Sequence, residues 1–171
     1  MKQAIAALLA VAMLFGLLKL FNRWELAQNA LDEGTPLPAF TLPDLQGRPV
    51  RLPTSGKRVL INYWASWCGP CLVEMPMLAD FARRNGDNGT QLVGIALEDQ
   101  RSSRIWLRAN PQPYPMLLEM PSKTDSSVRL GNAKGLLPFS VLVGADGRVL
   151  ATRTGPFASQ ADLDGWIADA Q

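Results

Sequence analysis

Histidine is absent from this 171-residue chain, and cysteine occurs at only two positions, Cys68 and Cys71. A structural zinc site needs four nitrogen or sulfur ligands, so one copy of the chain cannot complete such a site. We therefore predict no metal centre. The metal-binding alternatives are a zinc site shared between two chains and a copper or zinc chaperone that uses both thiols. The formal net charge of +2 is too small to indicate a nucleic-acid partner.

The two cysteines stand in the segment WCGPC, between a predicted strand and a predicted helix. Residues 59–64 are apolar and rich in strand-forming types, which indicates a buried strand. Apolar residues downstream recur at helical spacing, so a helix should begin at or near Cys68. Pro70 fits the first turn of that helix, where a missing N–H costs nothing. The strand thus delivers Cys68 to the helix N-terminus, and Cys71 follows one turn later on the same face.

This placement predicts reversible thiol–disulfide exchange. Unpaired N–H groups and the helix dipole at the N-terminus stabilise a thiolate, so we expect Cys68 to have a pKa below the ~8.5 of a free cysteine and to be the attacking sulfur. Cys71, one turn deeper, should resolve the mixed disulfide. A purely structural disulfide is disfavoured, because so short a loop constrains the unfolded chain little. We expect no cofactor beyond the redox-active Cys68–Cys71 disulfide.

The sequence around this pair resembles the thioredoxin fold. Pro76 lies five residues past the second cysteine, where thioredoxins carry a helix-kinking proline. Residues 135–141 resemble the family's cis-proline loop entering the next strand, and Asp146-Gly147 resembles the hairpin turn that follows. The resemblance covers residues 35–171. It implies an α/β three-layer sandwich, with a mixed central sheet and helices on both faces.

Three further features resemble the membrane-anchored TlpA/ResA/DsbE (CcmG) type of thiol-disulfide oxidoreductase. Residues 39–50 indicate an extra N-terminal β-hairpin. Asn62 stands where ordinary thioredoxin has a buried aspartate, and Glu74 occupies the place of this branch's active-site glutamate. One position departs from the pattern. Phe139 follows the proline where cytochrome-maturation members often carry an acidic residue, so the resemblance favours a general reductase.

The resemblance also assigns roles around the cysteines. Glu74 is implied to set the cysteine pKa values or to relay a proton, whereas the sequence alone favours a solvated helix carboxylate. The Leu137–Pro138 bond is implied to be cis, which would turn the Leu137 backbone toward an extended substrate segment. We expect Trp67 to be an exposed apolar contact for substrate rather than a core aromatic. The predicted substrate-binding residues are Trp67, Gly69, Pro70, Leu137 and Pro138.

The remainder of the chain alternates strand patterns with helical patterns and closes with a hairpin and a helix. Such an order gives a mixed sheet with helices on both faces, which agrees with the resemblance. We predict strands at 92–96, 114–118, 140–143 and 149–153, and helices at 101–109, 126–130 and 160–170.

The N-terminal segment predicts a membrane anchor. Residues 3–18 contain no charged residue, which is near the short limit for a spanning helix. A cleaved signal peptide is the alternative, but bulky and charged residues follow the apolar run. We divide the chain into an uncleaved anchor at 1–21, a linker at 22–34 and a thioredoxin-like domain at 35–171. Flanking charges do not orient the anchor. The resemblance implies single-pass attachment to the cytoplasmic (inner) membrane, with the domain in the periplasm or outside the cell.

These features together predict an extracytoplasmic enzyme that reduces protein disulfides through its Cys-x-x-Cys dithiol. The Gly-Pro dipeptide between the cysteines matches reducing thioredoxins. The expected partners are a disulfide-bearing protein and a membrane thiol reductase that supplies electrons. One alternative is a dedicated apocytochrome c disulfide reductase in cytochrome c maturation. Another is a peroxidase, whose cysteine normally stands in a Pro-x-x-x-Thr-x-x-Cys setting that the residues before Cys68 do not match.

Overall fold

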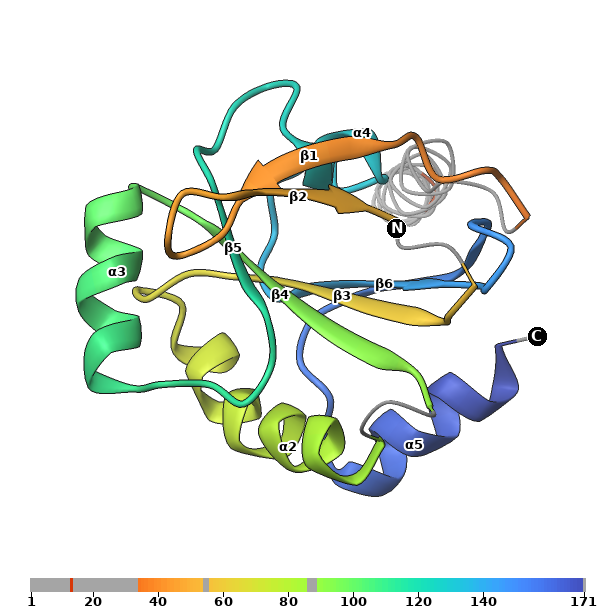
Figure 1. The fold of residues 1–171 in the computed structure, drawn as a ribbon. Coiled ribbons are helices and arrows are strands. Elements are labelled where there is room, and N and C mark those ends of the chain that lie inside the picture. The colour runs from red at the N-terminus through yellow and green to blue at the C-terminus, as the bar shows by residue number, and fades with distance from the viewer. Residues whose placement is uncertain (1–12, 14–33, 54–55, 86–88, 171) are drawn as a thin grey trace, which may run out of the picture. The chain divides into compact units, whose positions relative to one another are not determined.

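The computed structural model describes residues 13, 34–53, 56–85 and 89–170 (Figure 1). The chain divides into two units, residues 1–30 and 31–171, and Met13 is the described residue of the first, where it lies exposed in a helix. Among the residues described, no helix combines the length and the apolar character needed to cross a membrane. The predicted anchor and linker lie outside the described residues, apart from Met13 and Gly34.

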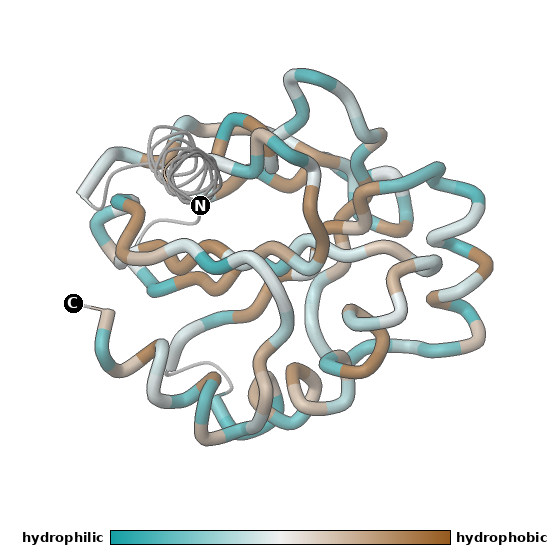
Figure 2. The backbone as a smooth tube through the Cα atoms, turned by 180° about the vertical axis from the view of Figure 1, so that it is seen from behind, coloured by the Kyte–Doolittle hydropathy of each residue, from teal (hydrophilic) through white to brown (hydrophobic). Residues whose placement is uncertain are grey.

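The second unit is built on a five-stranded mixed sheet with the order β5-β4-β3-β6-β7. Strand β3 (Val59–Trp64) lies in the middle, and all 6 of its residues are buried. It pairs in parallel with β4 (Gln91–Leu97), which pairs in parallel with β5 (Met116–Glu119). Strands β6 (Phe139–Val143) and β7 (Val149–Thr154) extend the sheet in antiparallel fashion. The central strands are mostly apolar, as expected for a sheet covered on both faces, with Asn62 and Ser140 as buried polar exceptions (Figure 2).

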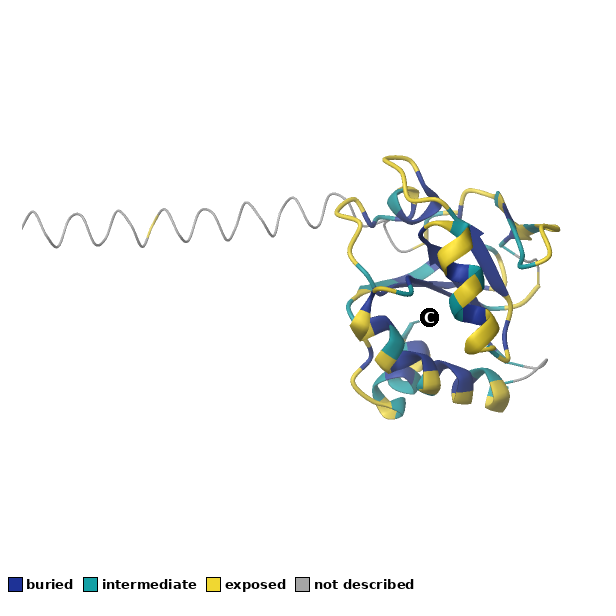
Figure 3. Ribbon diagram, turned by 90° about the vertical axis from the view of Figure 1, so that its left-hand side faces the viewer, coloured by how far each residue is buried: buried dark blue, intermediate teal, exposed yellow. Residues whose placement is uncertain are grey.

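One face of the sheet is covered by α2 (Gly69–Asn85), α3 (Gln100–Ala109) and α5 (Gln160–Asp169), which share one hydrophobic core cluster with it. The β3-α2-β4 and β4-α3-β5 connections step in the same direction across the sheet. Right-handed crossovers therefore place both helices on the same face. Figure 3 shows exposed residues along the outer sides of the helices and buried residues in the strands.

The opposite face carries a second core cluster, covered by a β-hairpin and by the short helix α4 (Ser126–Arg129) with Leu130 after it. The hairpin consists of β1 (Phe40–Pro43) and β2 (Pro49–Leu52). The predicted three-layer fold, mixed sheet and N-terminal hairpin are confirmed. Among the described elements, however, the helices are distributed unevenly, because the hairpin takes much of the space on the second face.

The hairpin closes through a short turn and lies next to the sheet edge. The side chain of Asp44 accepts hydrogen bonds from the backbone N–H groups of Gln46 and Arg48, and Gly47 adopts a φ of 81°, which favours glycine. Asp44 also forms an antiparallel bridge with Leu117 of β5. The hairpin thus covers part of what would be an open edge strand.

The predicted ends of the strands and helices agree with the observed ends to within one or two residues. The largest difference is at the start of β5. It begins at Met116 rather than at Tyr114. Pro115 precedes the strand and has no N–H to donate to a ladder, although its carbonyl accepts a hydrogen bond from Gly94. A second feature was not predicted: the Leu52–Pro53 peptide bond after the hairpin is cis.

Candidate active site

Cys68 caps the helix that carries the cysteine pair. Its backbone N–H donates to the carbonyl of Ala65 at 3.1 Å, and its own carbonyl accepts from the N–H of Leu72 at 3.1 Å. Its Sγ accepts from the backbone N–H of Cys71 at 3.3 Å, which is the geometry of an N-cap side chain. The helix begins at the next residue, Gly69, so the predicted start at or near Cys68 is confirmed. The sulfur therefore lies where N–H groups and the helix dipole favour negative charge.

The two cysteines are joined by a disulfide, with a Cα–Cα distance of 5.3 Å. Only 4% of Cys68 is exposed, and Cys71 is completely buried. This order of burial agrees with Cys68 as the sulfur that meets substrate and Cys71 as the sulfur that resolves the mixed disulfide. The assignment of those two roles stays a prediction.

The residues around the disulfide form an exposed apolar rim. Trp67 is 70% exposed, whereas Trp64, three residues earlier in β3, is fully buried. Gly69 and Pro70, between the cysteines, are also exposed. The predicted distinction between a core tryptophan and a surface tryptophan is confirmed.

Glu74 lies one turn past Cys71 on the buried side of α2, with 2% of its surface exposed. Its Oε1 accepts a hydrogen bond from Asn62 Nδ2 at 2.9 Å, and its Oε2 accepts from the backbone N–H of Phe157 at 3.1 Å. Asn62 also donates to Ser140 Oγ at 3.2 Å. The alternative of a solvated helix carboxylate is therefore wrong. The carboxylate instead ties α2 to β3 and to the loop between β7 and α5.

Burial is the main influence on the Glu74 carboxyl group. It raises the pKa above the ordinary value of 4.5, while the hydrogen bonds from Asn62 and Phe157 and the nearby Arg153 guanidinium lower it in part. The buried Tyr114 hydroxyl also has a raised pKa, chiefly from its own burial and secondarily from the charge of Glu74. A carboxyl group with a raised pKa, on the buried side of the helix that carries the cysteines, is suited to exchanging a proton.

The Leu137–Pro138 peptide bond is cis, as predicted. Pro138 is buried, and its carbonyl accepts a hydrogen bond from the backbone N–H of Gly155 at 2.9 Å. Leu137 is only partly buried and packs against both core clusters. Its backbone makes no hydrogen bond with the part of the chain that the structure describes. That backbone is available to pair with an extended segment.

A disulfide at a helix N-terminus together with a cis-proline loop is the arrangement that the sequence analysis predicted from family resemblance. Comparison with known protein families agrees with it. The sequence pattern that defines the AhpC/TSA family matches residues 34–152. The chain belongs to the AhpC/TSA family. Its match covers both the hairpin and the cysteine helix, and ends within β7.

Similar proteins carry names that describe thiol–disulfide chemistry. The sporulation thiol-disulfide oxidoreductase A of Bacillus subtilis (strain 168) is 24% identical over 162 residues, covering 92% of this chain and 93% of the relative. The thiol-disulfide oxidoreductase ResA of the same organism is 26% identical over 138 residues, covering 80% and 75%. A thiol:disulfide interchange protein of the thioredoxin family from Chlorobium tepidum TLS superposes with a TM-score of 0.66 at 28% identity, covering 82% and 99%.

The predicted thioredoxin-like family and the thiol–disulfide chemistry of the cysteine pair are thereby confirmed. In this AhpC/TSA family member, Trp67, Gly69 and Pro70 adjoin the cysteines in the chain. Leu137, which precedes the cis Pro138, lines the same surface cavity as Trp67. Their contacts with substrate stay predictions.

Glu98 is a site residue that the sequence analysis missed. It follows the last residue of β4 and is 5% exposed. Its carboxylate accepts from the backbone N–H of Ser66 at 2.9 Å, from Ser66 Oγ at 2.8 Å and from Ser103 Oγ at 3.1 Å. Because Ser66 is two residues before Cys68, this carboxylate fixes the loop that presents the disulfide. The available signal was an acidic residue at the carboxyl end of the strand next to β3.

Asn132 fixes the second loop of the site and was also missed. It is 4% exposed, its Oδ1 accepts from the backbone N–H of Leu136 at 2.9 Å, and its Nδ2 donates to the carbonyl of Leu136 at 3.0 Å. The Asn132 side chain therefore holds the turn that leads into Leu137 and Pro138 through hydrogen bonds to the backbone of Leu136. Asparagine next to a glycine, as in Gly131-Asn132, is a turn signal, but it does not reveal which carbonyl the side chain will bind.

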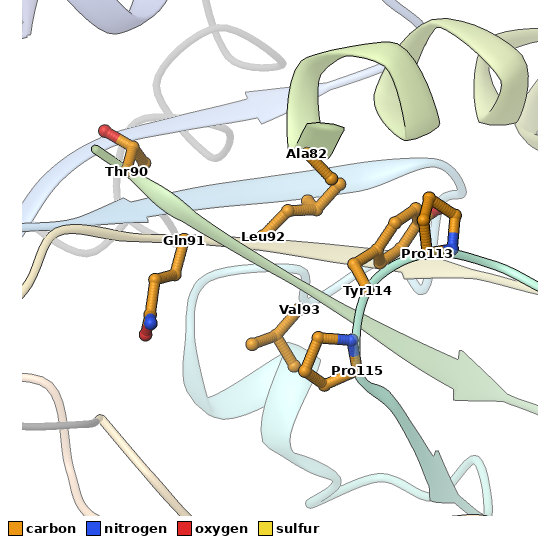
Figure 4. A pocket seen from close by; sticks show the side chains of 8 residues that line it. All are labelled: Ala82, Thr90, Gln91, Leu92, Val93, Pro113, Tyr114 and Pro115. Atoms are coloured by element: carbon orange, nitrogen blue, oxygen red, sulfur yellow. The ribbon is translucent and has the colours of Figure 1, made fainter. Parts of the chain in front are cut away.

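A cavity of about 270 Å³ lies away from this site, at the start of β4 (Figure 4). Thr90, Gln91 and Tyr114 contribute to its lining. Since Gln91 pairs with Val59 at the first residue of β3, and the cysteine loop follows the last, the cavity is at the other end of the sheet. No cysteine or carboxylate lines it, so it is not a candidate for the redox chemistry.

Proposed function

We propose that this chain is a membrane-tethered disulfide reductase that acts on proteins outside the cytoplasm. The observation that supports it best is the Cys68–Cys71 disulfide at a helix N-terminus, where the sulfur of Cys68 accepts the N–H of Cys71. In the reduced chain the same N–H is positioned to stabilise a Cys68 thiolate. An exposed Trp67 and the free Leu137 backbone flank this pair and suit a polypeptide substrate.

The proposed reaction transfers two electrons from the dithiol to the substrate. The Cys68 thiolate attacks one sulfur of the substrate disulfide, forms a mixed disulfide and expels the other substrate sulfur as a thiolate. The Cys71 thiolate then attacks Cys68 Sγ, which forms the Cys68–Cys71 disulfide and releases the second substrate thiolate. The two substrate thiolates take up the two protons lost by the cysteines. Glu74, with its raised pKa, is placed to relay one of them.

The location and the partners are part of the same proposal. An apolar run at residues 3–18 supports a single-pass anchor in the inner membrane, and a chain with no cysteines besides the reacting pair suits an oxidising compartment. Regeneration of the dithiol there requires a membrane thiol reductase. The buried Phe139 packs against Tyr63 in the core, so that position offers no acidic group to a substrate. This favours a general protein-disulfide reductase over one dedicated to apocytochrome c.

A stoichiometric assay tests the proposed activity. The full chain is purified in detergent, reduced, freed of reductant and mixed with insulin. We expect each chain to consume about one insulin disulfide, because one dithiol holds two electrons. A chain that stays reduced while insulin keeps its disulfides would contradict a protein-disulfide reductase. Oxidised chain, which carries no electrons, is the control.

A further inference from the structure

A groove of about 660 Å³ lies beside the cysteine pair. Trp67, which precedes Cys68, forms one wall, and Leu137, which precedes the cis-proline, forms another. The remaining walls come from four places: the end of β4 with the two residues after it, the loop before α4, Val128 of α4 itself, and the loop after α4 at 133–135. A polypeptide whose disulfide meets Cys68 would therefore extend directly into this groove.

The three acidic side chains of the groove are already engaged. Glu98 accepts hydrogen bonds from Ser66 and Ser103, as described above. Asp99 caps α3 by accepting from the backbone N–H of Ser102 at 3.0 Å. Asp125 caps α4 and accepts from the N–H groups of Val128 and Ser122. Glu98 and Asp125 are also buried, so they offer little to a ligand, whereas Asp99 is exposed and accepts through Oδ2 alone. One exposed carboxylate therefore accompanies the two exposed lysines of the groove.

The two basic side chains of the groove are not engaged. Lys123 and Lys134 are both exposed, and neither forms an ion pair or hydrogen bond within the described residues. They come from loops on either side of α4 and line the same groove as Trp67 and Leu137. The groove thus offers two free ammonium groups next to an apolar wall and an unpaired backbone segment.

We propose that this groove selects polypeptide substrates that carry acidic residues close to the target disulfide. The inference rests on the proposed reductase function and names its substrate class. The extended segment pairs with the Leu137 backbone, its apolar atoms contact Trp67, and its carboxylates meet Lys123 and Lys134. The lysines are exposed, so the preference is modest and weakens as salt increases.

The test compares two synthetic peptides with the same internal disulfide, one flanked by glutamates and the other by lysines. The reduced full chain should show a KM for the acidic peptide roughly fivefold lower at low ionic strength, with the difference shrinking in high salt. Replacing both groove lysines, Lys123→Glu and Lys134→Glu, should abolish or reverse the preference. The neutral small disulfide hydroxyethyl disulfide should be reduced at the same rate by both proteins.

A matched control changes the same amount of charge elsewhere. Arg101 and Arg108 are exposed on α3 and do not line the groove, so Arg101→Glu with Arg108→Glu should keep the preference for the acidic peptide. Equal KM values for the two peptides, or a preference that survives in the lysine variant, would overturn the groove proposal while reduction of hydroxyethyl disulfide upholds the reductase function. Failure to reduce any of the disulfides would overturn both.

Discussion

Replacing Cys71 with serine should leave a chain that attacks disulfides but cannot release the product. The Cys68 sulfur keeps its position at the helix N-terminus, and the backbone N–H of residue 71 is still present to stabilise the thiolate. Without the resolving sulfur, the mixed disulfide should accumulate as a covalent adduct with the substrate protein. Non-reducing electrophoresis with mass spectrometry measures it. Because the chain contains no other cysteine, any adduct of Cys71→Ser must be formed through Cys68.

The reciprocal variant separates the two roles. Cys68→Ser keeps only the fully buried Cys71, so it should show neither adduct nor insulin reduction above the uncatalysed rate. The double serine variant controls for non-covalent association. An adduct that forms with Cys68→Ser but not with Cys71→Ser would reverse the order of attack. Failure of both single variants to form an adduct would argue against protein substrates.

Replacing Glu74 should destabilise the fold and change its response to pH. Glu74→Ala removes the acceptor of the buried Phe157 N–H and one acceptor of the Asn62 amide, although Asn62 retains Ser140. A buried donor left without a partner costs roughly 1–3 kcal/mol, so urea unfolding should report a loss in that range or somewhat above. Glu74→Gln keeps an oxygen opposite Asn62 and should lose less.

The pH dependence follows from the raised pKa of Glu74. In the folded chain burial holds this carboxyl pKa above 4.5, so the folded state binds the proton more tightly than the unfolded state. The resulting stability is fully present below about pH 4.5 and is lost as the pH rises through the raised pKa. Wild type should therefore lose stability relative to Glu74→Gln as the pH rises above about 4.5. A constant difference over that range would show that Glu74 is not perturbed by burial.

A proton-relay role of Glu74 adds a kinetic result that a structural role would not produce. The pH profile of insulin reduction should change shape in Glu74→Gln, because a carboxamide cannot exchange a proton in this range. A variant that is less stable but keeps the wild-type profile would assign Glu74 to structure alone.

Local sequence patterns predict where the cysteine pair lies, because its position depends only on residues nearby in the chain. The apolar run at 59–64, the helical spacing after Cys68 and the proline at position 70 are all contained within one strand and one helix, so they place the cysteine pair at the helix N-terminus. The cis bond at Pro138 comes instead from family resemblance, since most X–Pro bonds are trans.

The hydrogen bonds that hold the site in place could not be predicted from local sequence patterns, because they join residues that are far apart in the chain. Glu98 reaches Ser66 across 32 positions of sequence, and Glu74 reaches Phe157 across 83. Such partners become neighbours only when the order of strands is known, and the parallel register of β3 and β4 decides the first of them. Sequence spacing places Glu74 on the cysteine helix, but whether it is solvated or buried depends on the loop that folds over it from β7.

The reduction potential of the Cys68–Cys71 pair tests most directly whether this chain is a reductant. The full chain in detergent is equilibrated with glutathione or dithiothreitol, and the dithiol fraction is read after alkylation. We expect a potential of about −250 mV or lower, near that of the reducing thioredoxins. A value of about −150 mV or higher would make the chain an oxidant or an isomerase. Such a value would contradict the proposal that a membrane thiol reductase supplies it with electrons.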